Sequence, residues 1–424
     1  MPPSPYQVNP LSLLTPKRFD IIAKYIFAKH RAIDSSFPLD LYRHHLEVWN
    51  NCNEITNPDK STFKDFVEEF DEILRSIKEE GFNSYISHIP TYKGCALNGA
   101  HRIAASILNH NSVCCIESAL EEGQLDCSHA YFAKRDQYVE GGLSSFYSDE
   151  MALEYAHIKR NTFIVTLFPT AHDQIDRARD LIESATGIVY EKALSLTDTG
   201  RFNFVRTLYD GEDWLGGPEN RFHGVMPKVR DCYGSSGPTT VFLVETKSPS
   251  VLPILKEEVR ALFNVGKHSI HINDTYEETL RISQAAFNDN SLHFLNHSKN
   301  IYFPHFEHLL ATLKHTINNH SLNFHDFCIG GSSTLTAYGL RQGEDLDYLH
   351  KFPEHKFVGH SSISSHNTEL HNYGHSKDDI LYNPANHFYY QGVKFASLKV
   401  IKDLKEKRRE PKDLVDSDLI SPII

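Results

Sequence analysis

The chain has 424 residues, of which 40% are hydrophobic and 23% charged, a composition that suits two or three globular domains with sizeable cores. Its 55 acidic and 43 basic side chains give a formal net charge of −12. Because binding a polyanion draws mainly on positive charge, this balance argues against a bulk nucleic-acid substrate, while a small nucleotide in a local basic pocket is compatible with it.

After an N-terminal arm, the clearest predicted helix covers residues 61–80. Apolar side chains recur there at spacings of three and four, Ser61 and Thr62 can cap its start, and Gly81 ends it. The next segment, residues 86–116, alternates apolar and turn-forming stretches. It predicts a short strand, a turn, a helix and a second strand.

The turn of this segment carries residues suited to bind an anion. Gly99, His101 and Arg102 lie at or near the predicted helix N-terminus, where free N–H groups and the helix dipole favour negative charge. The segment resembles the ParB/sulfiredoxin-like fold, whose members carry Gly-x-His-Arg or a close variant there and hold nucleotide phosphates with it. Asn98 departs from the acidic residue that many members have. The resemblance implies an α+β domain within residues 1–145; His and Arg would equally suit bracing of the small helix.

A polar, Gly- and Ser-rich stretch near residues 136–149 predicts a domain boundary. Beyond it, strands alternate with helices of roughly ten to fifteen residues, which predicts an α/β domain of unknown role over residues 146–300. The predicted strands are 161–168, 187–192, 239–245 and 268–272, and the predicted helices are 171–184, 250–263 and 275–287.

Three side chains of this middle block are candidates for ligand binding. Lys256 and Arg260 lie one turn apart on a predicted helix. His271 alternates with Ile270 and Ile272 in a predicted strand, so it would face away from them. On that face His271 could reach an anionic ligand together with the two cations.

The segment 327–349 carries the strongest functional pattern in the chain. An apolar run leads into a turn, and the segment closes on Asp345 and Asp347. On a strand, these two carboxylates would project from one face. Adjacent carboxylates repel each other unless a cation lies between them, and Mg²⁺ or Mn²⁺ suits such hard oxygen ligands. The turn consists of small residues whose backbone a phosphate could approach closely: Gly330, Gly331, Ser332 and Ser333.

This arrangement resembles the DNA polymerase β-like nucleotidyltransferase superfamily, in which a Gly-Gly or Gly-Ser turn follows a strand and Asp-x-Asp lies on the next strand. The resemblance covers residues 301–424 and implies a mixed sheet, with the two Asp as catalytic metal ligands and the turn as the phosphate site. Arg341 would stabilise the phosphate. A third carboxylate is expected on a later strand, and we choose Asp379 because the strand-like stretch 380–382 follows it.

The C-terminal tail is similar to that of many small nucleotidyltransferases. Residues 386–398 are strand-like, and residues 400–409 predict a helix rich in Lys and Arg. Lys394 and these cations could serve a triphosphate or an acidic acceptor. A charged helix is equally typical of a solvated face with ion pairs one turn apart.

Cysteine usage and hydropathy predict a cytoplasmic protein. The seven Cys contain no C-x-x-C pair, so we expect reduced thiols rather than a disulfide framework or a zinc site. The N-terminus lacks the basic start and apolar core of a signal peptide, and no run of about 18 apolar residues occurs. We therefore expect no membrane span.

Together these patterns predict a multidomain α/β transferase that uses Mg²⁺ or Mn²⁺ to move a nucleotidyl group from a nucleoside triphosphate to a small polar or sugar acceptor, a reaction that would suit surface polysaccharide biosynthesis. One alternative is a glycosyltransferase that binds a nucleotide sugar through Asp-x-Asp. A second is a nucleotide-binding protein without catalysis. A third is a kinase-like role for the corner around His101.

Overall fold

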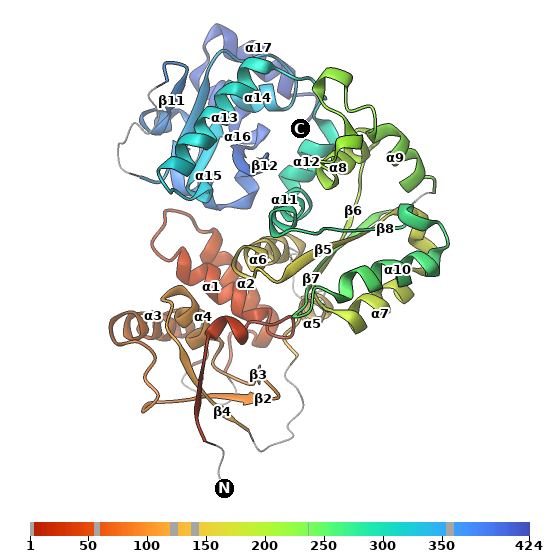
Figure 1. The fold of residues 1–424 in the computed structure, drawn as a ribbon. Helices are drawn as coiled ribbons and strands as arrows, with labels where there is room; N and C mark the ends of the chain where they lie inside the picture. Colours follow the sequence, from red (N-terminus) through yellow and green to blue (C-terminus); the bar gives the residue numbers. More distant parts are fainter. Residues whose placement is uncertain (1–3, 55–59, 119–125, 137–143, 236, 353–359) are drawn as a thin grey trace. The chain divides into compact units, whose positions relative to one another are not determined.

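A computed structural model gives the fold of the chain (Figure 1). It describes residues 4–54, 60–118, 126–136, 144–235, 237–352 and 360–424. The described residues form three open sheets accompanied by many helices, which confirms the predicted α/β class. The chain divides into two compact units. The N-terminal unit comprises Met1–Thr162, Ile182–Glu191 and Phe242–Val251, and the C-terminal unit comprises Phe163–Leu181, Lys192–Val241 and Leu252–Ile424.

The first sheet belongs to the N-terminal unit and has the strand order β1-β4-β2-β3. Its inner strands β4 and β2 are parallel, and both outer strands pair antiparallel to them. The strands are β1 (Tyr6–Val8), β2 (Ile89–Tyr92), β3 (Cys95–Ala96) and β4 (Val113–Glu117). The accompanying helices are α1 (Asp20–Lys29), α2 (Phe37–Asn50), α3 (Phe63–Glu80), α4 (Ala100–Leu108), α5 (His129–Asp136) and α6 (Ser144–Ile158).

Helix α3 confirms the prediction for residues 61–80 and shows why the helix starts and stops where it does. Asp65 Oδ2 accepts from the Thr62 N–H at 2.8 Å, and Thr62 Oγ1 accepts from the Asp65 N–H at 3.4 Å. This reciprocal capping satisfies two N–H groups that have no partner inside the helix. Gly81 ends the helix with a φ of 76°, and Phe66 and Phe70 are buried in the core.

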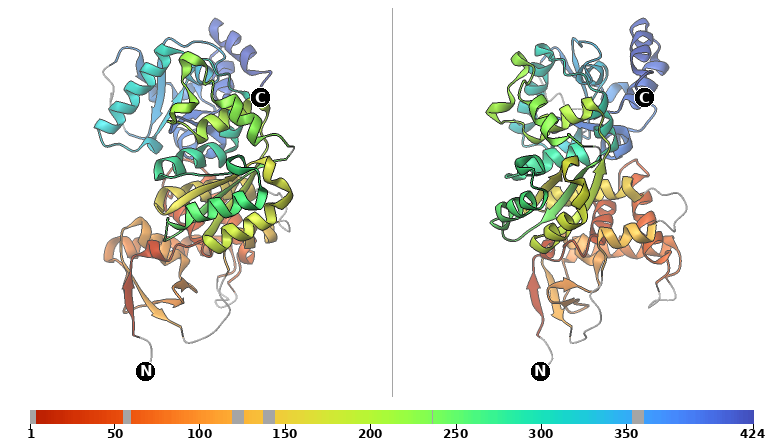
Figure 2. Two further views of the ribbon diagram at one scale, coloured as in Figure 1. Left: turned by 45° about the vertical axis from the view of Figure 1, so that its right-hand side comes forward. Right: turned by 90° about the vertical axis from the view of Figure 1, so that its right-hand side faces the viewer.

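The second sheet has the order β6-β7-β5-β8, and its edge strand β8 is antiparallel to β5. Its strands and helices match the predicted alternation, but α8 and α9 occupy a stretch for which only a Gly-rich loop was predicted. Helices α7 and α10 lie side by side in all three views (Figures 1 and 2). The strands are β5 (Thr162–Leu167), β6 (Gly187–Leu194), β7 (Thr239–Glu245) and β8 (Ile270–Ile272). The helices are α7 (Ile175–Ala185), α8 (Asp198–Leu208), α9 (Val225–Cys232), α10 (Val251–Phe263) and α11 (Tyr276–Ala286).

The third sheet lies in the C-terminal unit and is mixed, with the order β11-β10-β9-β13-β12. β9 pairs antiparallel with β10 and parallel with β13, while β11 runs parallel to β10. The strands are β9 (Phe327–Gly330), β10 (Leu346–His350), β11 (Ile363–Ser365), β12 (His387–Tyr390) and β13 (Val393–Ala396). The helices are α12 (Asp289–His297), α13 (Pro304–Asn319), α14 (Ser332–Ala337), α15 (Lys377–Tyr382), α16 (Leu398–Arg408) and α17 (Pro411–Ile420).

The strand predicted at residues 380–382 is wrong, because these residues form the end of α15. Ser376 Oγ accepts from the Asp379 N–H at 3.0 Å, so Ser376 caps the helix. Asp378 and Asp379 lie in its first turn, where negative charge suits the helix dipole. These local signals outweigh the strand propensity of the apolar residues that follow.

The strand-like stretch 386–398 is a hairpin of β12 and β13 rather than one strand. Its two central residues, Gln391 and Gly392, have φ values of 49° and 80°, as the tight turns between antiparallel strands require. The predicted helix at 400–409 is confirmed as α16. No helix of the described residues is long and apolar enough to cross a bilayer.

We predict that Thr62→Ala weakens the start of α3, because the substitution removes the side-chain acceptor for the Asp65 N–H. The expected loss is about 1 kcal/mol of local stability. Faster amide hydrogen exchange in the first turn of α3 would report it, and Thr62→Ser is the control because it keeps the hydroxyl. Unchanged exchange in Thr62→Ala would contradict the capping role.

Candidate functional site

The turn after β9 and the start of β10 form the candidate site of the C-terminal unit. Asp347 of β10 lies directly opposite Gly330 at the end of β9. Asp345 and Asp347 flank Leu346, which is buried in the core together with Tyr348. Leu346 and Tyr348 lie in the core as predicted, but all five residues of β10 are buried, Asp347 included, whereas Asp345, which precedes the strand, is exposed.

The two glycines of the turn make room for polar groups. Gly331 has a φ of 59° and a ψ of −143°, a backbone conformation that side chains disfavour. A Cβ atom on Gly331 would lie 2.7 Å from Asp347 Oδ2, and one on Gly330 would lie 2.8 Å from the Tyr373 hydroxyl. The missing side chain of Gly331 therefore lets the backbone approach the Asp347 carboxylate, and that of Gly330 lets it approach the Tyr373 hydroxyl.

The two serines of the turn bind the segment that carries Asp345. Ser332 Oγ donates to Asp345 Oδ1 at 3.3 Å, and Ser333 Oγ donates to the backbone carbonyl of Asp345 at 3.1 Å. Ser333 is fully buried, whereas Ser332 is half-buried and Asp345 is exposed. Ser333 thus positions the start of β10, and Ser332 and Asp345 face solvent together.

Asp347 is held by side chains that the sequence interpretation missed. Its Oδ1 accepts from Ser364 Oγ at 3.0 Å and lies 3.1 Å from His366 Nε2. The second ring nitrogen of His366 lies 3.3 Å from the Tyr373 hydroxyl. Burial, followed by the charge of Asp347, raises the pKa of Tyr373, so this hydroxyl stays protonated. The run of His between 360 and 375 was a signal for His366, but only the pairing of β10 with β11 brings Ser364 beside Asp347.

The two cations predicted to bind phosphate are engaged by the protein. The Arg341 Nε and NH2 groups donate to the two oxygens of Asp416 at 2.5 and 2.8 Å. This hydrogen bonding raises the pKa of Arg341, and the charge of Asp345 adds to the effect. Lys394 is buried, and its ammonium donates to two backbone carbonyls. Of the two, Arg341 is the one whose charge acts on an aspartate of the site.

Helices α16 and α17 form a buried ion-pair network around the partner of Arg341. Lys405 Nζ lies 2.9 Å from Asp413 and 2.8 Å from Asp416, and Arg408 pairs with Asp413 at 2.8 Å. Burial by itself raises the pKa of Asp413, but hydrogen bonds from Arg408 and Lys405 outweigh it and hold the pKa well below its usual range. Both aspartates are therefore ionised and firmly paired.

Among the described residues, no third carboxylate joins Asp345 and Asp347. No group of three His, Cys, Asp or Glu side chains able to hold a metal ion occurs in the part of the chain that the structure describes. Asp379 lies in α15, where its carboxylate lies 3.1 Å from His375 Nδ1 and accepts from Asn386 Nδ2 at 2.8 Å. β13, the strand on the other side of β9, carries no acidic residue.

One divalent cation nevertheless fits the two aspartates. The described partners of Asp347 use Oδ1, while Oδ2 faces the space that the missing side chain of Gly331 leaves. Asp345 adds an exposed carboxylate next to the Ser332 hydroxyl. Mg²⁺ commonly binds through one or two carboxylates and completes its shell with water and substrate phosphates. The donor set suits one such ion.

The N-terminal corner uses its predicted phosphate-binding residues in packing. His101 Nε2 lies 2.7 Å from the Tyr42 hydroxyl, and burial lowers the pKa of His101 well below its usual value. Arg102 donates to Ser87 Oγ and to a backbone carbonyl. Gly99 caps α4 with a φ of 85°, and a Cβ there would lie 2.6 Å from a methyl group of Ile89. These contacts match the alternative in which His101 and Arg102 brace the small helix α4.

The three candidates of the middle block lie on α10 and β8. Lys256 Nζ donates to the carbonyl of Ile272 at 3.2 Å, and Arg260 NH1 donates to Glu257 at 2.6 Å. The His271 ring packs edge-on against Tyr209, with 4.7 Å between the ring centres. As predicted from the alternation, Ile270 and Ile272 are buried on the other face.

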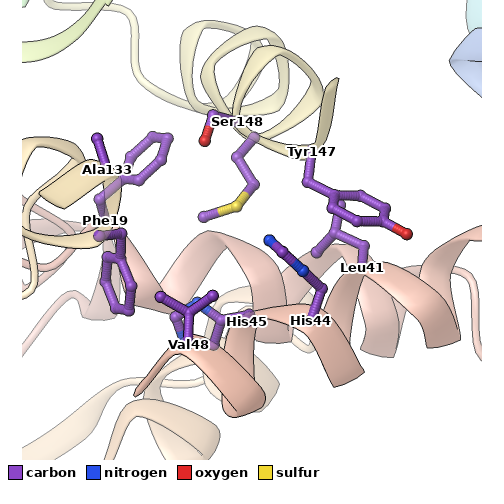
Figure 3. A pocket seen from close by; sticks show the side chains of 10 residues that line it. Phe19, Leu41, His44, His45, Val48, Ala133, Tyr147 and Ser148 are labelled. Atoms are coloured by element: carbon purple, nitrogen blue, oxygen red, sulfur yellow. The ribbon is translucent and has the colours of Figure 1, made fainter. Parts of the chain in front are cut away.

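A cavity lies in the N-terminal unit between α2 and α6 (Figure 3). His44 and His45 come from α2, and Tyr147 and Ser148 come from α6. His45 Nε2 lies 2.9 Å from the buried Lys24 ammonium, and burial, followed by the charge of Lys24, lowers the pKa of His45. The cavity is mainly apolar, and none of the predicted site residues lines it.

We predict that Gly331→Ala destabilises the C-terminal unit by more than about 2 kcal/mol, because the new Cβ adds a clash with Asp347 to the cost of a strained backbone. Gly392→Ala is a matched control: its φ is also positive, at 80°, but a Cβ there would meet nothing within 4 Å. Denaturant unfolding of both variants isolates the contribution of the clash. Equal losses in the two variants would contradict the close approach of Gly331 to Asp347.

Acid is expected to weaken the C-terminal unit through Asp413 and Asp416. Both pKa values lie below their usual range in the folded protein. The stabilisation is therefore complete above the unfolded-state pKa of about 3.9 and is lost as the pH falls through the lower folded-state values. Asp413→Asn should cost about 3 kcal/mol at neutral pH and flatten the dependence of stability on pH below about 4. Denaturant titrations between neutral and acid pH test this, and parallel curves for variant and wild type would contradict it.

Comparisons with models of protein families, with curated proteins and with solved structures found no match to this chain. The roles of its residues are therefore argued from geometry. The structure brings the turn together with Asp345 and Asp347, adds Ser364 and His366, and places Asp379 in a separate hydrogen-bonded group.

Proposed function

We propose that the C-terminal unit is a metal-dependent transferase of the nucleotidyltransferase type. It moves a nucleotidyl group from a nucleoside triphosphate to a small polar or sugar acceptor, a reaction that suits polysaccharide assembly. The observation that carries this proposal is the contact between the turn and the two aspartates. The Gly331 backbone lies against the buried Asp347, and the Ser332 hydroxyl donates to the exposed Asp345, at the end of β9.

Each residue has a distinct task in the proposed reaction. Asp345 and Asp347 would hold one Mg²⁺, which would supply positive charge to offset that of the nucleotide phosphates. Ser364 and His366 fix the Asp347 carboxylate in one orientation and leave Oδ2 toward the turn. Ser332 presents a hydroxyl donor to a phosphate oxygen beside Asp345. The turn backbone admits the phosphate because Gly331 has no side chain.

A second candidate function, nucleotide binding without turnover, is favoured by what surrounds the aspartates. The third carboxylate of the family pattern has no counterpart on β13, whose residues end in Phe395 and Ala396. The nearest predicted phosphate cation, Arg341, is tied to Asp416. A site with one metal ion and no third carboxylate can bind a nucleotide. It lacks a group that could take the proton from the attacking hydroxyl of the acceptor molecule.

We predict that the double variant Asp345→Asn/Asp347→Asn loses metal-dependent nucleotide binding by at least about a hundredfold, because the amides cannot replace two charged oxygen ligands. Calorimetric titration with ATP, CTP, UTP and nucleotide sugars, with Mg²⁺ and with EDTA, measures the loss. Tightest binding of a triphosphate supports nucleotidyl transfer, and tightest binding of a nucleotide sugar supports glycosyl transfer.

Asp198→Asn is the control, since Asp198 is exposed at the start of α8, in a different part of the unit. It should bind nucleotide as the wild type does. Turnover of the bound triphosphate with a sugar acceptor separates the transferase from the non-catalytic protein. Nucleotide binding that survives in the double variant would contradict the proposed site for both functions.

A further inference from the structure

Neighbouring strands of the second sheet present two buried polar groups without a partner. Thr166 of β5 pairs with His271 of β8 in the antiparallel ladder, so both side chains lie on one face. Among the described residues, neither Thr166 Oγ1 nor His271 Nε2 has a hydrogen-bond partner. Buried polar groups in folded proteins are nearly always satisfied, so this pair points to a ligand or to ordered water.

Helices α8 and α9 cover this face and bring an ammonium group to it. Tyr209, which follows α8, packs against the His271 ring. Lys228 of α9 lies 5.3 Å from the centre of the Tyr209 ring and 5.9 Å from that of Phe168. Phe168 follows Thr166 by two residues and shares its side of the chain. Lys228 is therefore positioned above the same face as the two unpaired groups.

The electrostatic environment of this face is positive. Burial, followed by the charges of Lys256, Lys228 and Arg281, lowers the pKa of His271 to about 3, and no carboxylate opposes them. His271 is therefore neutral at physiological pH. Three acidic side chains of the surrounding elements have a basic neighbour: Asp210 with Arg281, Asp231 with His268 and Glu257 with Arg260. Burial raises the pKa of Tyr209, and the charge of Glu212 adds to the rise.

We propose that Thr166, His271 and Lys228 form a binding site for a phosphate group, here called the β5–β8 phosphate site. A hydroxyl, the Nε2–H tautomer of a neutral imidazole and an ammonium all donate, and phosphate oxygens only accept. Lys256 and Arg281 add positive charge around it. Lys228 and His271 are half-buried residues, while the Thr166 hydroxyl and the His271 Nε2 atom are themselves buried.

Phosphate explains the site better than water does. A water molecule could satisfy the hydroxyl and the imidazole, but it would add no negative charge beside Lys228 and Lys256, whose ammonium groups donate to the neutral backbone carbonyls of Lys267 and Ile272. The thiol of Cys232 does not supply that charge, because burial raises the pKa of Cys232 to about 11, although Lys228 opposes the rise. A phosphate satisfies the donors and the charge together. This site shares no residue with the proposed metal site.

The test is an NMR titration of the full-length protein in EDTA, with the His271 ring resonances as the reporter. Orthophosphate and glucose 1-phosphate are the two probes, and tighter binding of the ester assigns the site to a phosphorylated substrate rather than to free phosphate. Either probe should raise the His271 pKa by about one pH unit or more. Lys228→Met should weaken binding at least tenfold, and Lys64→Met is the control because Lys64 is 80% exposed on α3.

Thr166→Val keeps the shape of the side chain and removes only the unpaired hydroxyl. It should weaken phosphate binding severalfold and leave the melting temperature without phosphate unchanged or higher. The proposal is overturned if neither probe shifts the His271 resonances or if Lys228→Met binds like wild type. It is also overturned if Thr166→Val lowers the melting temperature without changing phosphate affinity, because the hydroxyl then holds structural water. Asp345→Asn/Asp347→Asn should bind phosphate normally in EDTA, so the two proposals fail independently.

Discussion

The candidate site depends on one close contact, that between the Gly331 backbone and the Asp347 carboxylate. β9 and β10 are antiparallel and put Gly330 opposite Asp347, so the chain must turn sharply away at the next residue. The positive φ of Gly331 makes that turn, and the missing Cβ leaves Oδ2 uncovered on that side. Ser364 and His366 hold the other oxygen. A buried carboxylate is thereby held in one orientation beside the turn.

Placement of positive charge explains why a metal ion is central to the proposed function. Three cations of the C-terminal unit that could have served a phosphate are used inside the protein: Lys394 binds backbone carbonyls, Arg341 binds Asp416, and Lys405 bridges α16 and α17. A triphosphate at the turn would meet two carboxylates and few free cations. In the proposed function, a bound divalent ion would reverse that electrostatic balance. The β5–β8 phosphate site is the contrasting case, since there the cations surround unpaired donors and no metal is required.

Local sequence signals predicted much of the fold. The periodicity and cap of α3, the buried strands β5 and β7 and the turn before Asp345 each depend on residues close together in the chain. The wrong predictions for residues 380–382 and 386–398 also come from local signals, which were outweighed there by other residues close by in the chain. Ser376 and Asp379 made a helix cap where apolar residues suggested a strand, and the two-residue turn at Gln391 split one strand-like stretch into a hairpin.

The chemistry of the candidate site was less accessible from sequence, because it depends on partners far apart in the chain. That Asp347 would lie beside Ser364 follows only from the parallel pairing of β10 with β11. That Arg341 would be held by Asp416, 75 residues away, follows only from the packing of α17. His101 shows the same limit, since a motif suited to phosphate is also suited to a hydrogen bond with Tyr42.

Paramagnetic relaxation by Mn²⁺ tests the central claim most directly. Amide resonances of the protein would be recorded with a non-hydrolysable triphosphate and a trace of Mn²⁺, which broadens signals near the ion. The account predicts that broadening is strongest at Gly331, Ser332 and Asp345. Broadening centred elsewhere, or equal broadening when both aspartates are changed to Asn, would contradict the assignment of the metal and the nucleotide to this turn.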